Sequence, residues 1–176
     1  MSASFWGVEG VMSTTMEHAQ NWADTVFPPI EEVLPHRGTM LLTDEVLACG
    51  DTSVTVRARV DAGAWYADAN GAMPAWIGVE LMAQAIAAHV GLVAMRAGGK
   101  ARPGVLLGSS KYEALTPAFA RDTQLDVHAA ELLRSAEGHG AYQCTIDSAE
   151  GQRLAQAVIK VFQPTDFQAF IEGKSQ

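Results

Sequence analysis

The chain has 176 residues, of which 48% are hydrophobic and 18% charged, a balance typical of one globular domain with a substantial core. Its formal net charge of −8 argues against binding to nucleic acid or to anionic lipid, since both attract basic surfaces. The two cysteines, Cys49 and Cys144, stand far apart without metal-ligand spacing, so we expect free thiols in a reducing cytoplasm and no metal site.

The first 27 residues carry little information about the fold. They lack the basic and the continuous apolar regions of a secretory signal, and Met12 or Met16 could be the true start. Pro28 and Pro29 then mark the beginning of the globular part. We therefore expect a partly disordered N-terminal extension over residues 1–27 and a single domain over residues 28–176 of a cytoplasmic protein.

Residues 30–60 predict one helical turn and two strands. Residues 30–34 fit the helical turn, which Pro35 stops, and residues 39–47 fit a strand. Residues 52–60 alternate strictly between apolar and polar. One face would carry Val54, Val56, Ala58 and Val60, and the other Thr55, Arg57 and Arg59. This pattern is typical of a half-buried antiparallel strand.

Pro74 opens a segment, PAWIGVELMAQAIAAHVGLVAM, that predicts a long helix. Ala, Leu and Met favour helices, Pro is tolerated in a first turn, and Gly98-Gly99 supplies a C-terminal stop. Apolar residues occupy every side, interrupted mainly by Glu80, Gln84 and His89, so lipid or protein must surround the helix. An acidic residue inside a bilayer costs on the order of 3 kcal/mol, so we expect a core helix and no membrane span.

The remainder of the chain predicts four more strands. They are expected at residues 105–112, 124–133, 141–147 and 153–162, with a hairpin turn at 148–151 and a short helix beginning at Thr165. Two strands, one helix that needs cover on all sides and four further strands make an α+β chain. An antiparallel sheet wrapped around one long central helix gives that cover, and this arrangement is the hotdog fold.

Two segments carry a family resemblance. EEVLPHRGTMLLTDEV, residues 31–46, and MPAWIGVELMAQAIAAHVG, residues 73–91, resemble the 3-hydroxyacyl-acyl-carrier-protein dehydratases, which have hotdog folds. A weaker likeness follows in LGSSKYEALTPAFARDTQLDV, so the resemblance spans roughly residues 30–163. With Trp76 and Gly78, the helix segment is most similar to the dehydratase-like proteins of aryl polyene lipid gene clusters.

The resemblance implies removal of water from 3-hydroxyacyl thioesters in fatty acid or aryl polyene lipid synthesis, without a cofactor. The thioester would be carried by acyl carrier protein or coenzyme A. Glu80 matches the acid on the family's central helix and is the expected catalytic residue, although Gln84 or backbone N–H groups could hold its carboxylate for structural reasons alone. Backbone donors at Ala75 and Trp76, together with Gln84, are the expected substrate-binding groups; ordinary solvated N–H groups are the alternative.

One departure from the family leaves the source of the base open. The family's Gly-His-Phe-Pro histidine would fall near Tyr66, where this chain reads AWYADANGAMP. His36 in the LPHR motif is structural, as in the family, or a substitute base if the fold brings it near Glu80. A histidine from a partner would otherwise be needed, and this chain would then be a non-catalytic or half-catalytic subunit beside an active dehydratase.

A rival enzyme and an assembly state follow from the same fold. A hotdog acyl thioesterase, which uses one acidic residue on the same helix, would also fit the retained Glu80. Either reading predicts at least a homodimer or a heterodimer with another hotdog subunit, because hotdog monomers leave a sheet edge open.

A run without acidic residues extends from Leu81 to Tyr112. It contains Arg96, Lys100 and Arg102, which we expect to dock an acidic carrier protein or the phosphates of coenzyme A. The alternative is that basic residues simply favour a helix C-terminus.

Overall fold

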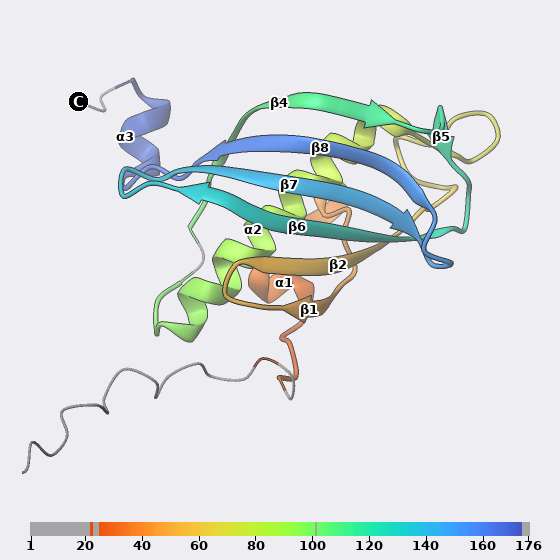
Figure 1. Cartoon of the computed structure of the whole chain (residues 1–176). Helices are drawn as coiled ribbons and strands as arrows, with labels where there is room; N and C mark the ends of the chain where they lie inside the picture. Colours follow the sequence, from red (N-terminus) through yellow and green to blue (C-terminus); the bar gives the residue numbers. More distant parts are fainter. Residues whose placement is uncertain (1–21, 23–24, 101, 174–176) are drawn as a thin grey trace, which may run out of the picture.

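A six-stranded antiparallel sheet curls around one long helix in the computed structural model, which describes residues 22, 25–100 and 102–173 (Figure 1). The strand order is β1-β2-β6-β7-β8-β4. The six strands are β1 (Glu45–Cys49), β2 (Ser53–Arg59), β4 (Val105–Ala114), β6 (Gln124–Arg134), β7 (His139–Ser148) and β8 (Arg153–Phe162). A separate pair of two-residue strands, β3 (Met73–Pro74) and β5 (Ala118–Phe119), was not predicted. The hotdog fold expected from the sequence is confirmed.

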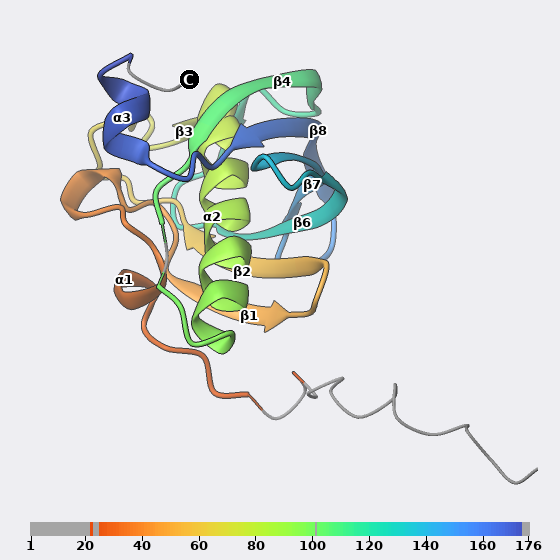
Figure 2. The same ribbon diagram turned by 90° about the vertical axis from the view of Figure 1, so that its left-hand side faces the viewer.

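The central helix α2 (Gly78–Arg96) follows a 3-10 turn, η2 (Ala75–Ile77), and ends before Gly98, whose φ of +76° favours glycine. Figure 2 shows the sheet on one side of α2 and the short helix α1 (Ile30–Val33) on the other. By length and composition, Ala75–Arg96 is apolar enough to cross a membrane, but most of it is buried inside the protein. The helix therefore serves as the core element that the sequence predicted.

The alternation predicted for β2 is present, since Val54, Val56, Ala58 and Val60 are all buried. The strand predicted at residues 39–47 begins later than expected. A 3-10 turn, η1 (Gly38–Met40), comes first, and β1 starts only at Glu45. The reason is tertiary, because residues 40–43 form hydrogen bonds to a helix side chain instead of to a neighbouring strand.

The apolar composition of α2 predicted that protein would surround the helix on all sides, but one side is only partly covered. Glu80, Ala83, Ala87 and Val90 follow one another along one side of the helix and are only partly buried. The sheet covers the opposite side, and this stripe faces a cavity instead.

Both ends of the described chain pack onto this framework. Trp22, from the predicted extension of residues 1–27, stacks on Phe27 and donates a hydrogen bond from Nε1 to Asp51 Oδ1 at 3.0 Å. Most of that extension lies outside the described residues. At the other end, the N-cap of α3 (Phe167–Ile171) is Asp166, one residue after the predicted cap at Thr165, because Asp166 accepts the hydrogen bond from the Ala169 N–H.

Candidate active site

Two side chains from distant parts of the sequence meet at the partly buried stripe of α2 that faces the cavity. His36 Nε2 lies 3.6 Å from Glu80 Oε1, and the two side chains are 28% and 33% exposed. Glu80 sits in the first turn of α2, where the partial positive charge of the helix N-terminus favours a carboxylate. His36 follows Pro35, which ends the segment carrying α1. The fold therefore satisfies the condition on which a role for His36 depended.

Gln84 connects this pair to the rest of the protein. Its amide is completely buried; Nε2 donates to Glu80 Oε1 at 2.9 Å and to Met40 O at 2.7 Å. Its Oε1 accepts from the Leu42 N–H at 3.0 Å and from Thr43 Oγ1 at 3.4 Å. Every polar atom of the amide is engaged inside the protein, so Gln84 orients the Glu80 carboxylate. Its predicted contact with substrate has no support here.

A cavity of about 400 Å³ extends from His36 and Glu80 along α2. Most of its wall is apolar. The wall is formed by Pro35, Ala83, Ile86, Ala87 and Val90 on one side and by residues 102–106 and 161–163 on the other. A reacting group placed at the His36–Glu80 pair would thus be at one end of a mainly apolar channel.

The helix start is arranged differently from the prediction. The N–H of Ala75 donates to Pro117 O at 3.0 Å, so it does not point to a substrate carbonyl. The carbonyl of Ala75 accepts a hydrogen bond from the Tyr112 hydroxyl. Trp76 is 64% exposed and lines a separate hollow with Tyr112 and Leu115. Because the Ala75 N–H is already bonded to the Pro117 carbonyl, this geometry does not support Ala75 as an oxyanion donor, and the role stays a prediction.

Tyr66, at the position expected for the family's histidine, takes part in the core. It is buried, its hydroxyl accepts from the Asp61 N–H at 3.0 Å, and burial raises its pKa. His89 is also buried; its ring nitrogens lie 3.4 Å from Tyr142 Oη and 3.2 Å from Gly50 O. Neither residue lines the cavity, so among the described residues of this chain only His36 brings an imidazole to Glu80.

The three predicted docking residues have different surroundings. Arg96 stacks over Trp22 at 4.1 Å and lies 3.9 Å from Asp51 Oδ1. Lys100 is exposed, and Arg102 forms part of the cavity wall. Carrier docking by these residues stays a prediction. Among the described residues, no group of three or more His, Cys, Asp or Glu side chains is placed to hold a metal ion.

The second wall of the cavity and a polar hollow beyond it were not predicted from the sequence. These surfaces come from the ends of β6, β7 and β8 and from the segment before β4. No local motif marks such residues, because each contributes one side chain from a separate strand. Only the pairing of the strands could have identified them.

Comparisons with known proteins agree with this architecture. The sequence model of the ApeP-like family, described as ApeP dehydratase, matches residues 28–172. The structure is similar to the dehydratase heterocomplex ApeI:P from Xenorhabdus doucetiae, with a TM-score of 0.79 and 25% identity over 86% of this chain and 100% of that chain. A hypothetical thioesterase with coenzyme A from Streptococcus pneumoniae TIGR4 shares the fold, at a TM-score of 0.54 and 19% identity over 69% of this chain and 88% of that one. A search of curated proteins finds no match.

Proposed function

Because the chain belongs to the ApeP-like dehydratase family, we propose that it removes water from 3-hydroxyacyl thioesters at the His36–Glu80 pair. The observation that carries the site assignment is the 3.6 Å approach of the two side chains at the end of the apolar cavity. A carboxylic acid group and a neutral imidazole at this separation would supply the acid and the base that the elimination needs.

The reaction can be written with these two groups alone. His36 Nε2 removes the C2 proton, the electron pair of that bond forms the C2=C3 double bond, and the C3–O bond breaks. A proton passes from the Glu80 carboxyl group to the departing hydroxyl, which leaves as water. The proton on His36 then returns to the Glu80 carboxylate, and the short separation of the pair favours this transfer. Gln84 holds the carboxylate in position through its hydrogen bond.

A partner subunit is the second source of a base. The similar protein from Xenorhabdus doucetiae is described as a heterocomplex, and this chain lacks the Gly-His-Phe-Pro histidine. We therefore expect the chain to act as a dimer, either with itself or with a histidine-bearing hotdog subunit. Its substrate would be bound to acyl carrier protein or coenzyme A, and the aryl polyene pathway is the expected context.

The test is an enoyl-absorbance assay with a 3-hydroxyacyl thioester. The chain is assayed alone and mixed with a histidine-bearing hotdog dehydratase that has been inactivated at its own helix acid. Glu80→Gln should lower the rate by on the order of 100-fold or more, because an amide is too weak an acid to protonate the leaving hydroxyl. His36→Gln should lower it equally if His36 is the base, and should leave the mixture unchanged if the partner supplies the histidine.

Two exposed or half-exposed positions provide matched controls. Glu31→Gln on α1 and His128→Gln on β6 make the same chemical changes away from the cavity and should keep full activity. Absence of enoyl product in every combination, or full activity of Glu80→Gln, would contradict the proposal. Release of free thiol from an acyl thioester would instead identify the rival thioesterase.

A further inference from the structure

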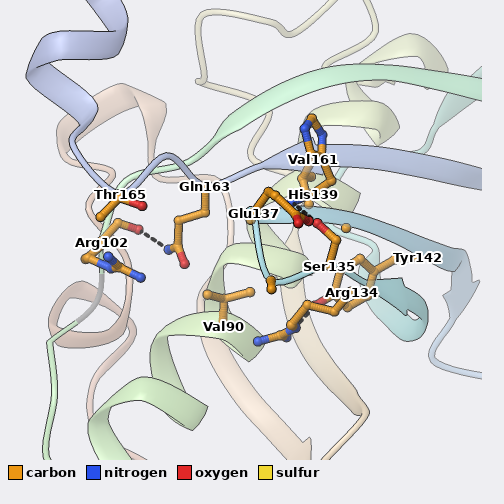
Figure 3. Close-up of a pocket in the computed structure, with 13 residues that line it drawn as sticks. Val90, Arg102, Arg134, Ser135, Glu137, His139, Tyr142, Val161, Gln163 and Thr165 are labelled. Atoms are coloured by element: carbon orange, nitrogen blue, oxygen red, sulfur yellow. Dashed lines mark hydrogen bonds between the residues drawn. The ribbon is translucent and has the colours of Figure 1, made fainter. Parts of the chain in front are cut away.

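Figure 3 shows a second hollow, which has a volume of about 200 Å³. It adjoins the cavity near Val90, at the end remote from Glu80. Four residues form part of both walls: Val90, Arg102, Val161 and Gln163. At about 1.5 Å per residue, the ten helical rises of α2 between Glu80 and Val90 span about 15 Å. The two hollows therefore lie end to end along α2, from the His36–Glu80 pair to a distant pocket. Together they are called the channel, and the second of them the far hollow.

The two parts of the channel differ in chemistry. Along α2 the side chains are apolar, whereas the far hollow is lined by polar and charged groups. Figure 3 shows Arg102, Gln163 and Thr165 on one side of this hollow, Arg134 and Ser135 on the other, and Val90 on the helix between them. Gln163 Nε2 donates to the Arg102 carbonyl at 2.9 Å, which ties that side together. A ligand that follows the channel thus meets apolar walls first and hydrogen-bonding groups last.

Arg134 is held rigidly in the wall of the far hollow. Its Nε donates to Glu131 Oε2 at 2.9 Å, and its Nη2 donates to Tyr142 Oη at 2.8 Å. Tyr142 donates to Glu131 Oε2 at 3.1 Å and contacts the buried His89, so the network continues into the core. A donor fixed in this way needs little reorganisation to bind a ligand.

The charges in and beside the far hollow offset one another. Arg102 and Arg134 are the cationic groups, Glu137 lines the same hollow, and Glu131 pairs with Arg134 at 2.7 Å. A carboxylate or phosphate entering the hollow would meet Glu137, whereas a neutral hydroxyl could use both the donors and the acceptors. The hollow therefore suits an uncharged polar group.

Resting on the proposed function and on an acyl chain in the apolar part of the channel, we propose that the far hollow binds an uncharged hydrogen-bonding group at the end of that chain. The rival occupant of the apolar part is the pantetheine arm of the carrier. That arm contains two amides, which would be desolvated against the side chains of Ala83, Ala87 and Val90. An alkyl or polyene chain has no such cost. With carbon–carbon bonds near 1.5 Å in a zigzag, the channel accepts roughly twelve chain carbons beyond the reacting ones.

This assignment changes the expected place of carrier docking. Arg102 lines the far end of the channel, where the chain end would be, and Lys100 is two residues before it in the sequence. A carrier docked there would direct its arm, rather than the acyl chain, along α2. The docking prediction and the present proposal are therefore alternatives that one experiment separates.

The experiment measures binding without chemistry. Acyl-pantetheine amides, in which nitrogen replaces the thioester sulfur, are titrated by calorimetry into the full chain, in the assembly that it forms with itself or with its hotdog partner. The series has four-carbon and about fifteen-carbon chains, the long ones ending in a methyl, a hydroxyl or a carboxylate. The long hydroxyl-ended amide should bind about tenfold more tightly than the methyl-ended one, because it gains a buried hydrogen bond. The carboxylate should bind no better than the methyl.

Variants locate the effect in the channel. Val90→Phe, at the junction of the two hollows, should weaken both long uncharged amides at least tenfold and leave the four-carbon amide within twofold; Ala87→Leu is the smaller alternative if Val90→Phe does not fold. Arg134→Met should remove the preference for hydroxyl over methyl. Arg153→Met breaks a comparable ion pair, Arg153 with Asp147, outside the hollow and should preserve that preference.

Three results would overturn the proposal. Equal weakening of short and long amides by Val90→Phe would mean that the pantetheine arm fills the channel. Unchanged binding of all amides would mean that neither part of the ligand enters it. Equal affinity for methyl and hydroxyl ends would remove the role of the far hollow. Failure of the enoyl assay would count against the dehydratase reaction, and these affinities would still decide the occupant of the channel.

Discussion

At the scale of single residues, the site depends on one amide that is neither acid nor base. Gln84 joins Glu80 to Met40, Leu42 and Thr43, so the same side chain orients the carboxylate and holds the segment that follows His36. Gln84 bridges the helix that carries Glu80 and the segment that follows His36, and it therefore helps to fix the distance between these two side chains.

Gln84→Leu should destabilise the fold and disable the site together. The leucine fills a similar volume but leaves the Leu42 N–H and the Met40 carbonyl without their partner in a buried place. We expect a loss of about 1–3 kcal/mol in the free energy of unfolding, measured by urea denaturation. Gln156→Leu, which removes one exposed bond to Glu113, should cost less than about 0.5 kcal/mol. Equal effects of the two variants would argue against this role of Gln84.

His89 should make stability depend on pH. Burial lowers its pKa below the ordinary value of 6.5, so the folded protein keeps the ring neutral. As the pH falls below about 6.5 the unfolded chain binds a proton that the folded chain does not, and stability is lost, by at most about 1.4 kcal/mol per pH unit. His89→Gln removes this contribution, so the difference in unfolding free energy between wild type and variant should shrink between pH 7 and pH 5. A difference that stays constant across this range would contradict the assignment.

At the scale of elements, the start of α2 is set by a close approach. A Cβ added at Gly78 would lie 2.6 Å from Tyr112 Oη and 2.9 Å from Ile146 Cδ1. Tyr112 reaches the helix here from β4 and donates to the Ala75 carbonyl. Gly78 is thus required by packing, even though glycine disfavours a helix.

Gly78→Ala should therefore destabilise the protein, although alanine favours helices by about 1 kcal/mol. Overpacking against the Tyr112 ring and Ile146 costs typically 1–3 kcal/mol, which should exceed that gain. Urea denaturation would measure the net loss. Gly50→Ala is the control, since its nearest neighbour would be Ser53 Oγ at 3.6 Å, an ordinary contact. A more stable Gly78→Ala variant would show that Tyr112 moves aside freely.

At the scale of the whole molecule, the sheet has an open edge. Among the described residues, strand β4 pairs with β8 alone, and Leu106 and Leu107 near its start are 41% and 53% exposed. Unpaired backbone groups beside exposed leucines are typical of an edge that pairs with another chain. We therefore expect β4 to form the contact with a second hotdog subunit, of the same or of another kind.

Leu107→Lys should weaken that assembly, because pairing would bring the charged side chain into the contact. Light scattering at micromolar concentration should show at least a dimer for the wild type, alone or mixed with its hotdog partner, and a shift towards monomer for the variant. Leu132→Lys places the same charge at a leucine that is 59% exposed on β6, an inner strand, and should not change the mass. A wild-type monomer under all conditions would refute the expected dimer.

Much of this architecture could be predicted from the sequence because its signals are local. The alternation along β2, the Ala- and Leu-rich run of α2 and its glycine stop each depend on neighbours within a few residues. The position of Glu80 on the central helix followed from the same run together with the family resemblance. The late start of β1 did not, because the backbone of residues 40–43 bonds to Gln84 and leaves the strand ladder.

The sequence by itself therefore determined the elements, the hotdog order of strands and helix, and the candidate acid. The tertiary structure alone decided that His36 and Glu80, 44 residues apart, lie 3.6 Å from each other, and that the Ala75 N–H is bonded to Pro117. It also decided that Arg102 and Arg134 line one hollow. The physical reason is range: helix and strand periodicity acts over a few residues, whereas these contacts arise only when the curled sheet brings distant segments around α2.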